Sequence, residues 1–226
     1  MGDQRRPLLP GEPAPAFALP AANLEAMVSL DSLRGRAFLI GFYRGLHCPF
    51  CRRQVLQLAG VQADLQALGV ETLAVINTPV ERARLYFRHR PTPVRLLCDP
   101  DCLTHRAFGV PYLEFQPETE GERSGWPYRA SMAEFGAARI NPAAALPAPM
   151  QPMEANAALN AMDGFELDQT DQAIFESHAT QLVGHFLVDG SGIVRWAQIE
   201  ARDGPNGLCS FREAAQFIAA ASSLAR

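Results

Sequence analysis

Hydrophobic residues in the first half of the chain form short continuous runs that alternate with helical periodicity. The runs Ala37 to Tyr43 and Val70 to Ile76 are almost wholly apolar, which is typical of strands covered on both faces. Between them, a pattern that opens at Pro49 and stops at Gly69 predicts a helix, because apolar residues recur at three- and four-residue spacing. These residues are Val55, Leu58, Val61, Leu65 and Leu68.

The alternation continues with a predicted helix from Val80 to His89 and a predicted short strand from Val94 to Leu97. An order of strand, helix, strand, helix, strand predicts parallel neighbours joined by right-handed crossovers. The sequence has no internal repeat, so a single α/β sheet is the simplest outcome.

From about residue 116 to 156 the pattern changes. This segment contains six prolines and little periodicity, so we predict an insertion without regular structure. A helix is predicted after it, from Asp168 to Leu182, with Asp168 or Thr170 as its cap.

The end of the chain contains a predicted strand pair and a final helix. The strands His185 to Val188 and Ile193 to Ile199 are joined by the turn DGSG. Ser210 and Glu213 have the spacing of a capping box, and an alanine-rich amphipathic helix follows them.

Composition sets the class of protein and excludes several partners. The 226 residues, 48% of them hydrophobic, suffice for one large domain or one domain with an insertion, and we expect a single domain over 1–226. The net charge is −4 and there is no basic tract, so nucleic acid is not expected as a partner. No apolar window reaches membrane-spanning length and the amino terminus lacks a signal-peptide core, so we expect no membrane partner and a cytoplasmic protein.

Two of the five cysteines form a C-x-x-C pair, Cys48 and Cys51, in the stretch FYRGLHCPFCRR. The pair lies where the first predicted strand meets the first predicted helix, and unpaired N–H groups at a helix amino terminus favour a thiolate. Positive charge nearby adds to this effect, from Arg44, His47, Arg52 and Arg53. A C-x-x-C beside alternating strands and helices indicates a redox dithiol.

The cysteine pair has two other interpretations. The pair could be two small buried hydrophobes. It could also bind zinc together with Cys98 and Cys102, but the residues between those two form no short zinc knuckle. We therefore expect no metal and no cofactor, a structural or accessory role for Cys98 and Cys102, and an incidental role for Cys209.

Five stretches in a fixed order resemble one family. They are GEPAPAFAL (Gly11 to Leu19), VSLDSLRGR, AFLIGFYRG, LLCDPDCLTHRAFGVP (Leu96 to Pro111) and HFLVDGSGIVR (His185 to Arg195). The chain resembles the alkyl hydroperoxide reductase and thiol-specific antioxidant group, that is, the peroxiredoxin-like redoxins. The resemblance implies a thioredoxin-like α/β fold with a central mixed sheet flanked by helices, and it leaves the proline-rich insertion outside.

The chain departs from the family motif P-x-x-x-T-x-x-C in two positions. Arg44 stands in place of the proline and Cys48 in place of the threonine, while Cys51 takes the place of the peroxidatic cysteine. A thioredoxin pattern would instead make Cys48 the attacking thiol, so the two templates disagree. Val183 occupies the position of a family arginine, and Arg44 is the nearest candidate to replace it.

Further candidates surround the pair. His47 could tune the pKa of Cys48 or face solvent in a turn, whereas His89, His105, His178 and His185 are expected to be structural or surface residues. Apolar side chains of the insertion could cover the pair as a substrate pocket, or could form an interface or an arm. They are Trp126, Pro127, Tyr128, Met132, Phe135, Met150 and Met153.

These features together predict a thiol-dependent antioxidant oxidoreductase that reduces hydroperoxides. The expected catalytic residues are Cys48, Cys51, Arg44 and His47, and the dithiol would cycle to a disulfide that an external dithiol, such as a thioredoxin-like protein, reduces. The alternatives are a general thiol-disulfide oxidoreductase with little peroxidase activity and a non-catalytic redox sensor. A homodimer is one option for assembly.

Overall fold

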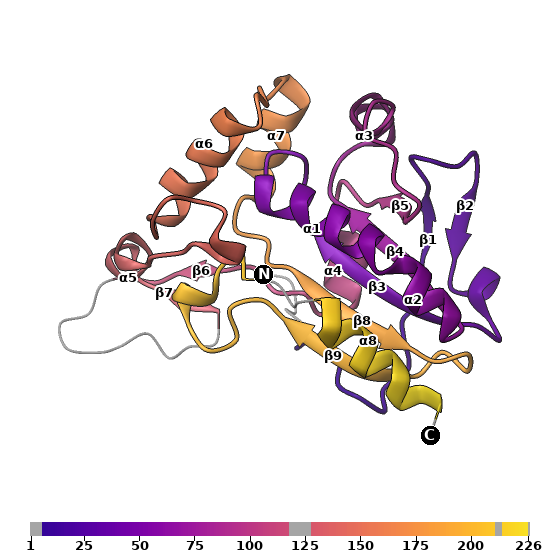
Figure 1. The fold of residues 1–226 in the computed structure, drawn as a ribbon. Helices are drawn as coiled ribbons and strands as arrows, with labels where there is room; N and C mark the ends of the chain where they lie inside the picture. Colours follow the sequence, from indigo (N-terminus) through magenta and orange to yellow (C-terminus); the bar gives the residue numbers. More distant parts are fainter. Residues whose placement is uncertain (1–5, 118–127, 211–213, 226) are drawn as a thin grey trace.

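A five-stranded mixed sheet forms the centre of the protein (Figure 1). The computed structural model describes residues 6–117, 128–210 and 214–225. The strand order is β5-β4-β3-β8-β9, in which β3, β4 and β5 are parallel and β8 runs antiparallel to both of its neighbours. The strands are β3 (Ala37–Tyr43), β4 (Val70–Ile76), β5 (Arg95–Cys98), β8 (Gly184–Val188) and β9 (Val194–Ile199).

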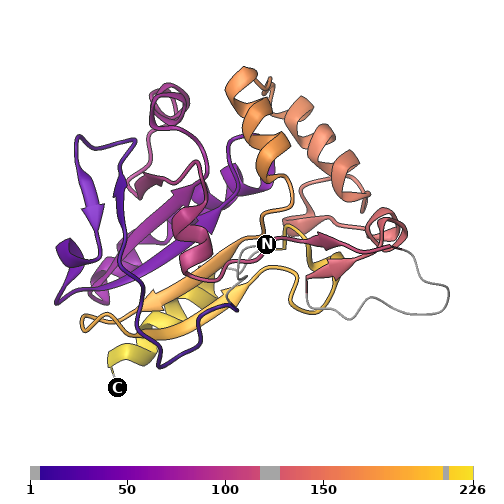
Figure 2. The same cartoon turned by 180° about the vertical axis from the view of Figure 1, so that it is seen from behind.

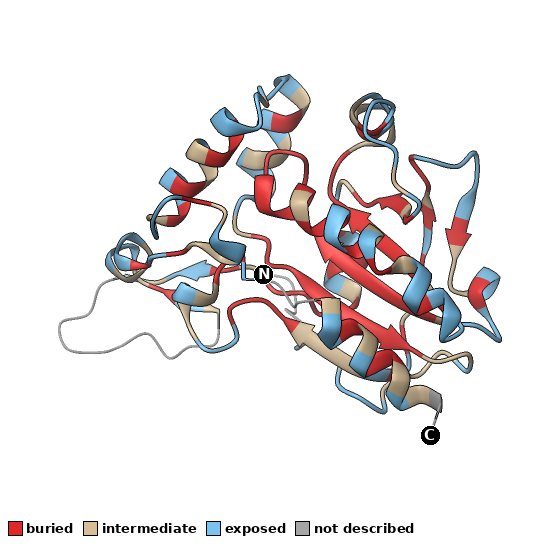
Figure 3. Cartoon of the chain, viewed as in Figure 1, coloured by how far each residue is buried: buried red, intermediate tan, exposed pale blue. Residues whose placement is uncertain are grey.

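Alternating residues of β3 pack into two separate hydrophobic clusters. Leu39 and Tyr43 belong to one cluster, which the sheet shares with the long helices, whereas Phe38 and Phe42 belong to the other. Because successive side chains of a strand point to opposite faces, the two clusters lie on the two sides of the sheet. Figure 3 shows that the central strands are buried along almost their whole length, as a strand covered on both faces should be.

Helices cover both faces of the sheet. The first cluster is covered by α1 (Pro49–Gly60), α2 (Gln62–Ala67) and α8 (Ala214–Ser222), and α3 (Val80–Phe87) also contributes to it. Behind the sheet lies α4 (Leu103–Ala107), whose end packs Phe108 into the second cluster (Figure 2). A small hairpin of β1 (Ala18–Pro20) and β2 (Met27–Ser29) closes the β5 side. The predicted α/β fold with parallel crossovers is confirmed.

The helix predicted between Pro49 and Gly69 is interrupted in the structure. It divides into α1 and α2 at Val61, whose φ and ψ of −107° and 3° are not helical. Gly60, which has a low helix propensity, ends the first piece. Gly69 has the positive φ of 73° that a helix-ending glycine supplies. The apolar periodicity continued through the break because both pieces pack on the same cluster.

The insertion contains regular structure, so the prediction of an irregular segment from 116 to 156 is wrong for the described residues. It holds β7 (Arg129–Ala130), which pairs with β6 (Glu114–Phe115), the helix α5 (Met132–Ala137), the short 3-10 helix η2 (Pro142–Ala144) and the start of α6 (Pro152–Met162). Pro142 and Pro152 stand in the first turn of their helices, where proline costs no hydrogen bond. Here proline marks helix starts.

The remaining predicted elements are found with shifted ends. Helix α7 runs Gln169–His178, and Asp168 caps it through a capping box with Asp171, as predicted for the start. It ends before Leu182 because Gln181 pairs with Tyr112 in a β-bridge. The predicted capping box of the last helix lies outside the described residues at Glu213. Among the helices that the structure describes, none has both the length and the apolar character to cross a membrane.

Candidate redox site

The loop that follows β3 carries the cysteine pair to the carboxyl end of the sheet. The N–H of Leu46 donates a hydrogen bond to Thr78 Oγ1 at 3.1 Å. Gly45 lies so close to this neighbour that an added Cβ would stand 2.7 Å from Asn77 Oδ1 and 2.9 Å from Thr78 Oγ1. The loop therefore packs against the β4–α3 connection without room for a side chain, and this close approach fixes where Cys48 begins α1.

Cys48 is the N-cap residue of α1. Its backbone is extended, with φ −94° and ψ 103°, and its sulfur accepts a hydrogen bond from the backbone N–H of Cys51 at 3.3 Å. The next residue, Pro49, supplies the fixed φ of a first helical position. A sulfur in this place faces the unpaired N–H groups and the positive end of the helix dipole, both of which favour an anion.

Arg44 connects Cys48 to the far end of the chain. Its Nε donates to Cys48 Sγ at 3.5 Å, and its two terminal nitrogens contact the Glu200 carboxylate at 2.9 and 3.1 Å. Glu200 is itself fully buried and accepts from the backbone N–H of Val183 at 2.7 Å. Val183, which stands where the family has an arginine, thus supplies only a backbone N–H to Glu200. The guanidinium of the site comes from Arg44 instead.

Cys209 also lies in this site, so the expectation of an incidental role is wrong. Arg44 Nη2 donates to Cys209 Sγ at 3.3 Å, while Nε of the same guanidinium donates to Cys48 Sγ at 3.5 Å, so one side chain holds both sulfurs. Its backbone N–H donates to Glu200 Oε1 at 2.6 Å. Sequence reasoning missed both Glu200 and Cys209, because neither stands in a motif and about 150 residues separate them from Cys48.

Cys48, Cys51 and Cys209 therefore share one charged environment, and it shifts their pKa values in opposite directions. Burial by itself raises the pKa of Cys48, but hydrogen bonds from Cys209 and Cys51 and the charge of Arg44 outweigh it and hold that pKa well below its ordinary value. Burial and the neighbouring Cys48 sulfur raise the pKa of Cys51 and of Cys209 well above theirs. All five cysteines are free. Of the three thiols, Cys48 is thus the one whose pKa is lowered, and it is the one most readily ionised.

His47 adds a neutral imidazole. It is buried, its ring packs edge-on against Phe175 with 5.4 Å between centroids, and burial lowers its pKa to about 4. Neither ring nitrogen has a hydrogen-bond partner among the described residues. A buried imidazole without partners normally costs free energy, and this ring borders the cavity that holds Cys48.

A cavity of about 310 Å³ opens over Cys48, and its lining is mostly apolar. Arg44, His47, Cys48 and Cys209 supply its polar wall. Of the apolar insertion residues singled out in the sequence, Met132, Phe135 and Met153 line this cavity, whereas Tyr128 and Met150 pack on the core. Trp126 and Pro127 lie outside the described residues. The cavity is also lined by Phe50, Leu113, Phe115, Pro152, Asn156, Phe175, Ala179, Thr180, Leu182 and Leu208.

The other basic residues near the pair, Arg52 and Arg53, hold the end of α6 against α1. Arg52 donates to Asn160 Oδ1 and Asp163 Oδ2, both at 2.9 Å, and stacks 4.0 Å over the ring of Phe165. Arg53 also pairs with Asp163, at 2.5 Å. These contacts tie α1 to α6, so the two arginines support the cavity wall and do not face Cys48.

Cys98 and Cys102 do not belong to the site. Burial raises the pKa of Cys98 to about 12 and that of Cys102 to about 11, so neither shares the lowered pKa of Cys48. Cys102 accepts a hydrogen bond from Asn77 at 3.6 Å. Among the described residues, no group of three or more histidine, cysteine, aspartate or glutamate side chains is placed to hold a metal ion.

His185 and His105 are structural, as expected. His185 bonds Tyr43 and Gln198, each at 3.0 Å, and His105 bonds Asp99 at 2.7 Å. Both are buried within the sheet and its loops.

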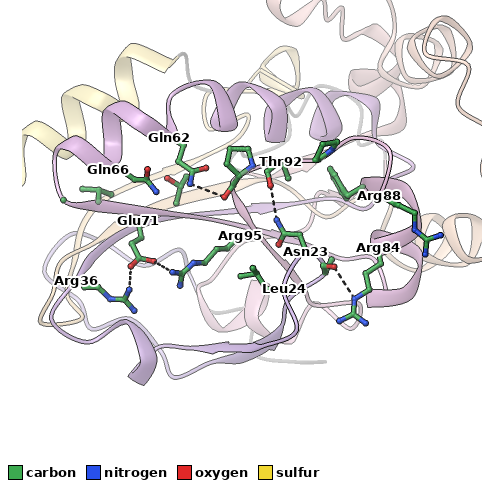
Figure 4. Close-up of a pocket in the computed structure, with 17 residues that line it drawn as sticks. Asn23, Leu24, Arg36, Gln62, Gln66, Glu71, Arg84, Arg88, Thr92 and Arg95 are labelled. Carbon is green, nitrogen blue, oxygen red and sulfur yellow. Dashed lines mark hydrogen bonds and ion pairs between the residues drawn. The ribbon is translucent and has the colours of Figure 1, made fainter.

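A larger cavity, of about 810 Å³, lies at the opposite end of the sheet (Figure 4). It is lined by several arginines, but Arg36 and Arg95 converge on Glu71, and Arg84 donates to the carbonyl of Ala22 at 3.2 Å. No cysteine or histidine lines it. The chemistry of the chain is therefore gathered at the smaller cavity.

The fold and the thiol cluster define a redoxin of the thioredoxin-fold class. The reduced 2-Cys peroxiredoxin of Plasmodium vivax superposes with a TM-score of 0.58 at 15% identity, covering 97% of this chain and 83% of its own. Peroxiredoxin Q of Xanthomonas campestris gives 0.54 at 14% identity, covering 93% and 92%. At such identities the likeness concerns the fold.

The family follows from the sequence comparisons. The AhpC/TSA family profile matches residues 10–132, so the chain belongs to the AhpC/TSA family. A Haemophilus influenzae protein provisionally named peroxiredoxin bcp is 33% identical over 104 residues, which are 46% of this chain and 66% of that relative. The chain thus spans just under two thirds of the relative's length. The family profile ends at residue 132, before Glu200 and Cys209.

Proposed function

We propose that this protein is a thiol peroxidase that reduces hydroperoxides through Cys48 and Cys51. The observation that carries the proposal is the place of the Cys48 sulfur, which accepts from Arg44 at 3.5 Å and from the Cys51 N–H at 3.3 Å on the wall of an apolar cavity. A thiolate is the nucleophile in thiol chemistry, and the lowered pKa of Cys48 favours that form. The thioredoxin-like order of attack, with Cys48 first, is the one that this arrangement supports.

The first step oxidises Cys48. Its thiolate attacks the terminal oxygen of the hydroperoxide, the O–O bond breaks, and the products are a sulfenic acid on Cys48 and an alkoxide that takes a proton from water. The neutral His47 is suited to donate a hydrogen bond to the leaving oxygen, and Arg44 to stabilise its charge. The sulfur loses two electrons and the peroxide gains them.

The second step forms the disulfide. Cys51 attacks the sulfenic sulfur, the S–O bond breaks, and the hydroxyl leaves as water with the proton of Cys51. While Cys48 is an anion, its charge raises the pKa of Cys51. Once Cys48 is a neutral sulfenic acid this repulsion ends, so Cys51 becomes easier to ionise only after the peroxide has reacted.

The third step returns the protein to the dithiol. An external dithiol, such as a thioredoxin-like protein, would attack the disulfide and leave with both oxidising equivalents. We place this cycle in the cytoplasm, where such reductants keep thiols reduced. Light scattering on the same preparation measures whether the protein is a homodimer.

A second candidate function is general thiol-disulfide exchange. It is favoured by a C-x-x-C whose first sulfur caps a helix and by Val183 in the position of the family arginine. A redox sensor without turnover is a third candidate.

Stopped-flow kinetics separates the candidates. The reduced protein is mixed with hydrogen peroxide or cumene hydroperoxide, and the rate of thiol oxidation is compared with that of free cysteine. The peroxidase proposal requires a faster rate with at least one peroxide. If neither peroxide reacts faster but a disulfide substrate exchanges, the second candidate holds; if neither reaction occurs, the sensor remains.

A further inference from the structure

Cys209 lies between two cavities. It lines the cavity over Cys48, and it also lines an open groove of about 660 Å³ on the outer side of α1. Other residues of this groove are Phe50, Arg53, Gln54, Gln57, Pro142 and Ser210. Cys209 is 9% exposed, whereas Cys48 and Cys51 are each 1% exposed. Of the three thiols, Cys209 is therefore the one that a molecule approaching from outside α1 meets.

Its sulfur is also held toward Cys48. Arg44 donates to both sulfurs, at 3.3 Å to Cys209 and at 3.5 Å to Cys48, and the backbone N–H of Cys209 is fixed on Glu200 Oε1 at 2.6 Å. The residue has a φ of 59°, a left-handed conformation that a side chain other than asparagine or aspartate rarely adopts. Such a conformation persists only where the surroundings impose it, and here it keeps the thiol beside the thiolate.

We propose that Cys209 is a second resolving thiol, which forms a disulfide with Cys48 and presents it to the external reductant through the groove on α1. This inference rests on the proposed peroxidase function. The Cys209 sulfur attacks the Cys48 sulfenic acid, an S–S bond forms and an S–O bond breaks, and water leaves with the Cys209 proton. The same disulfide also arises when Cys209 attacks Cys48 in a Cys48–Cys51 disulfide and releases the Cys51 thiolate, which takes up a proton.

The direction of reduction follows from the leaving groups. In thiol-disulfide exchange, the sulfur whose thiol has the lower pKa leaves faster. Attack by an external dithiol on Cys209 Sγ expels the Cys48 thiolate, which Arg44 stabilises at 3.5 Å. The second thiol of the dithiol then attacks the mixed disulfide, releases Cys209 as a thiol, and leaves as a disulfide. The oxidising equivalents thus pass from a sulfur that is 1% exposed to one that borders the groove.

Peptide mapping tests the inference directly. Trypsin leaves Cys48 and Cys51 together in peptide 45–52 and Cys209 in peptide 203–212. A Cys48–Cys209 disulfide therefore joins two peptides, whereas a Cys48–Cys51 disulfide only removes two hydrogens from one. The wild type and Cys51→Ser are treated with one equivalent of hydrogen peroxide, alkylated, digested without reductant and analysed by mass spectrometry.

We expect the joined peptides as the main product of Cys51→Ser and a measurable product of the wild type. Cys51→Ser should turn over with dithiothreitol within about tenfold of the wild-type rate, since Cys209 still resolves. In Cys51→Ser/Cys209→Ser the reaction should stop at a Cys48 sulfenic acid, which dimedone traps. A second double variant carries Cys209→Ala in place of Cys209→Ser. Cys102→Ser, which changes a buried thiol away from the site, should behave as the wild type.

The inference is overturned if Cys51→Ser forms a persistent sulfenic acid and no joined peptide, an outcome that leaves the peroxidase function intact. If no variant forms a sulfenic acid and the wild type does not react with peroxide, the peroxidase function fails and the inference with it. The wild type is mapped as well, so the experiment still tests the Cys48–Cys209 disulfide if a variant does not fold.

Discussion

Arg44 and Glu200 form a buried ion pair in which two nitrogens of the guanidinium contact the two carboxylate oxygens, at 2.9 and 3.1 Å. The side chains are 8% and 0% exposed. A paired charge of this kind must keep its partner, since removing one member strands the other in the interior. The pair orients the guanidinium so that Nε is left for Cys48, and the thiolate therefore depends on a carboxylate that it does not touch.

Replacing Arg44 by lysine should slow the reaction of Cys48. Lysine keeps the charge beside Glu200 but lacks the planar fork that reaches carboxylate and sulfur together. We expect the rate of Cys48 alkylation by iodoacetamide at pH 6.5 to fall several-fold, because the pKa of Cys48 rises when no guanidinium reaches its sulfur. Mass spectrometric fragmentation distinguishes Cys48 from Cys51. Arg195→Lys, on the exposed Asp189 pair, is the control, and an unchanged rate in Arg44→Lys would contradict the role.

The pH dependence of alkylation should show a thiolate that persists below neutral pH. The pKa of Cys48 lies well below its ordinary value, so the thiolate is present above that lowered pKa and is lost only as the pH falls through it. Between pH 8.5 and 6.5 we expect less than a threefold fall in rate, where an ordinary thiol falls about fiftyfold. Free glutathione measured in parallel is the reference, and a glutathione-like fall at Cys48 would refute the assignment.

His47 should act in the peroxide reaction more than in alkylation. Its pKa of about 4 leaves the ring neutral across the working range, so the rate should show no histidine step between pH 5 and 8. We expect His47→Phe to slow sulfenic acid formation about a hundredfold and Cys48 alkylation less than tenfold. His47→Gln, which keeps a hydrogen-bond donor, should recover part of the loss. Equal losses in both reactions would mean that His47 is only structural.

A methyl group at Gly45 should disturb the loop that carries Cys48. Its Cβ would lie 2.7 Å from Asn77 Oδ1, and overpacking of this kind costs about 1 to 3 kcal/mol. Urea unfolding should therefore show a lower free energy of unfolding for Gly45→Ala. Gly60→Ala is a matched control, since nothing lies within 4 Å of its added Cβ, and it should raise stability by about 0.5 to 1 kcal/mol. Equal stabilities would contradict the close packing of the loop.

Phe135 should select for bulky hydroperoxides. Its ring lines the apolar side of the cavity over Cys48, so Phe135→Ala should raise KM for cumene hydroperoxide about tenfold, from the loss of about 1.5 kcal/mol of apolar contact. The rate with hydrogen peroxide should change little, because that substrate buries almost no apolar surface. The exposed Met162→Ala is the control. A parallel change for both peroxides would mean that the insertion does not bind substrate.

The strand-to-helix junction that holds Cys48 was predictable because its signals are local. The apolar run of β3, the proline at the start of α1 and the glycine at the end of α2 each act within a few residues of the element they define. The regular structure of the insertion was not predicted because a proline in the first turn of a helix cannot be told from a loop proline by its identity alone. Only the residues that follow the proline, which either continue a helix or do not, distinguish the two cases.

The site itself was only half predictable. Arg44, His47, Cys48 and Cys51 are adjacent in sequence and were identified together. Glu200 and Cys209 enter through the end of β9 and the loop after it, and no periodicity or spacing links them to Cys48. The sequence also leaves the nucleophile open, because the proposal of Cys48 depends on which sulfur caps the helix and accepts from Arg44.

The distance along the chain between Cys48 and Glu200 has a consequence for biosynthesis. A ribosome completes β3 and α1 well before it adds the last strand, so the emerging dithiol has neither Glu200 to orient Arg44 nor the Cys209 thiol to stabilise Cys48. In that state the contacts that lower the pKa of Cys48 in the folded protein are missing. The dithiol therefore gains the environment on which the proposed peroxidase cycle depends only when the last strand and the loop after it have folded.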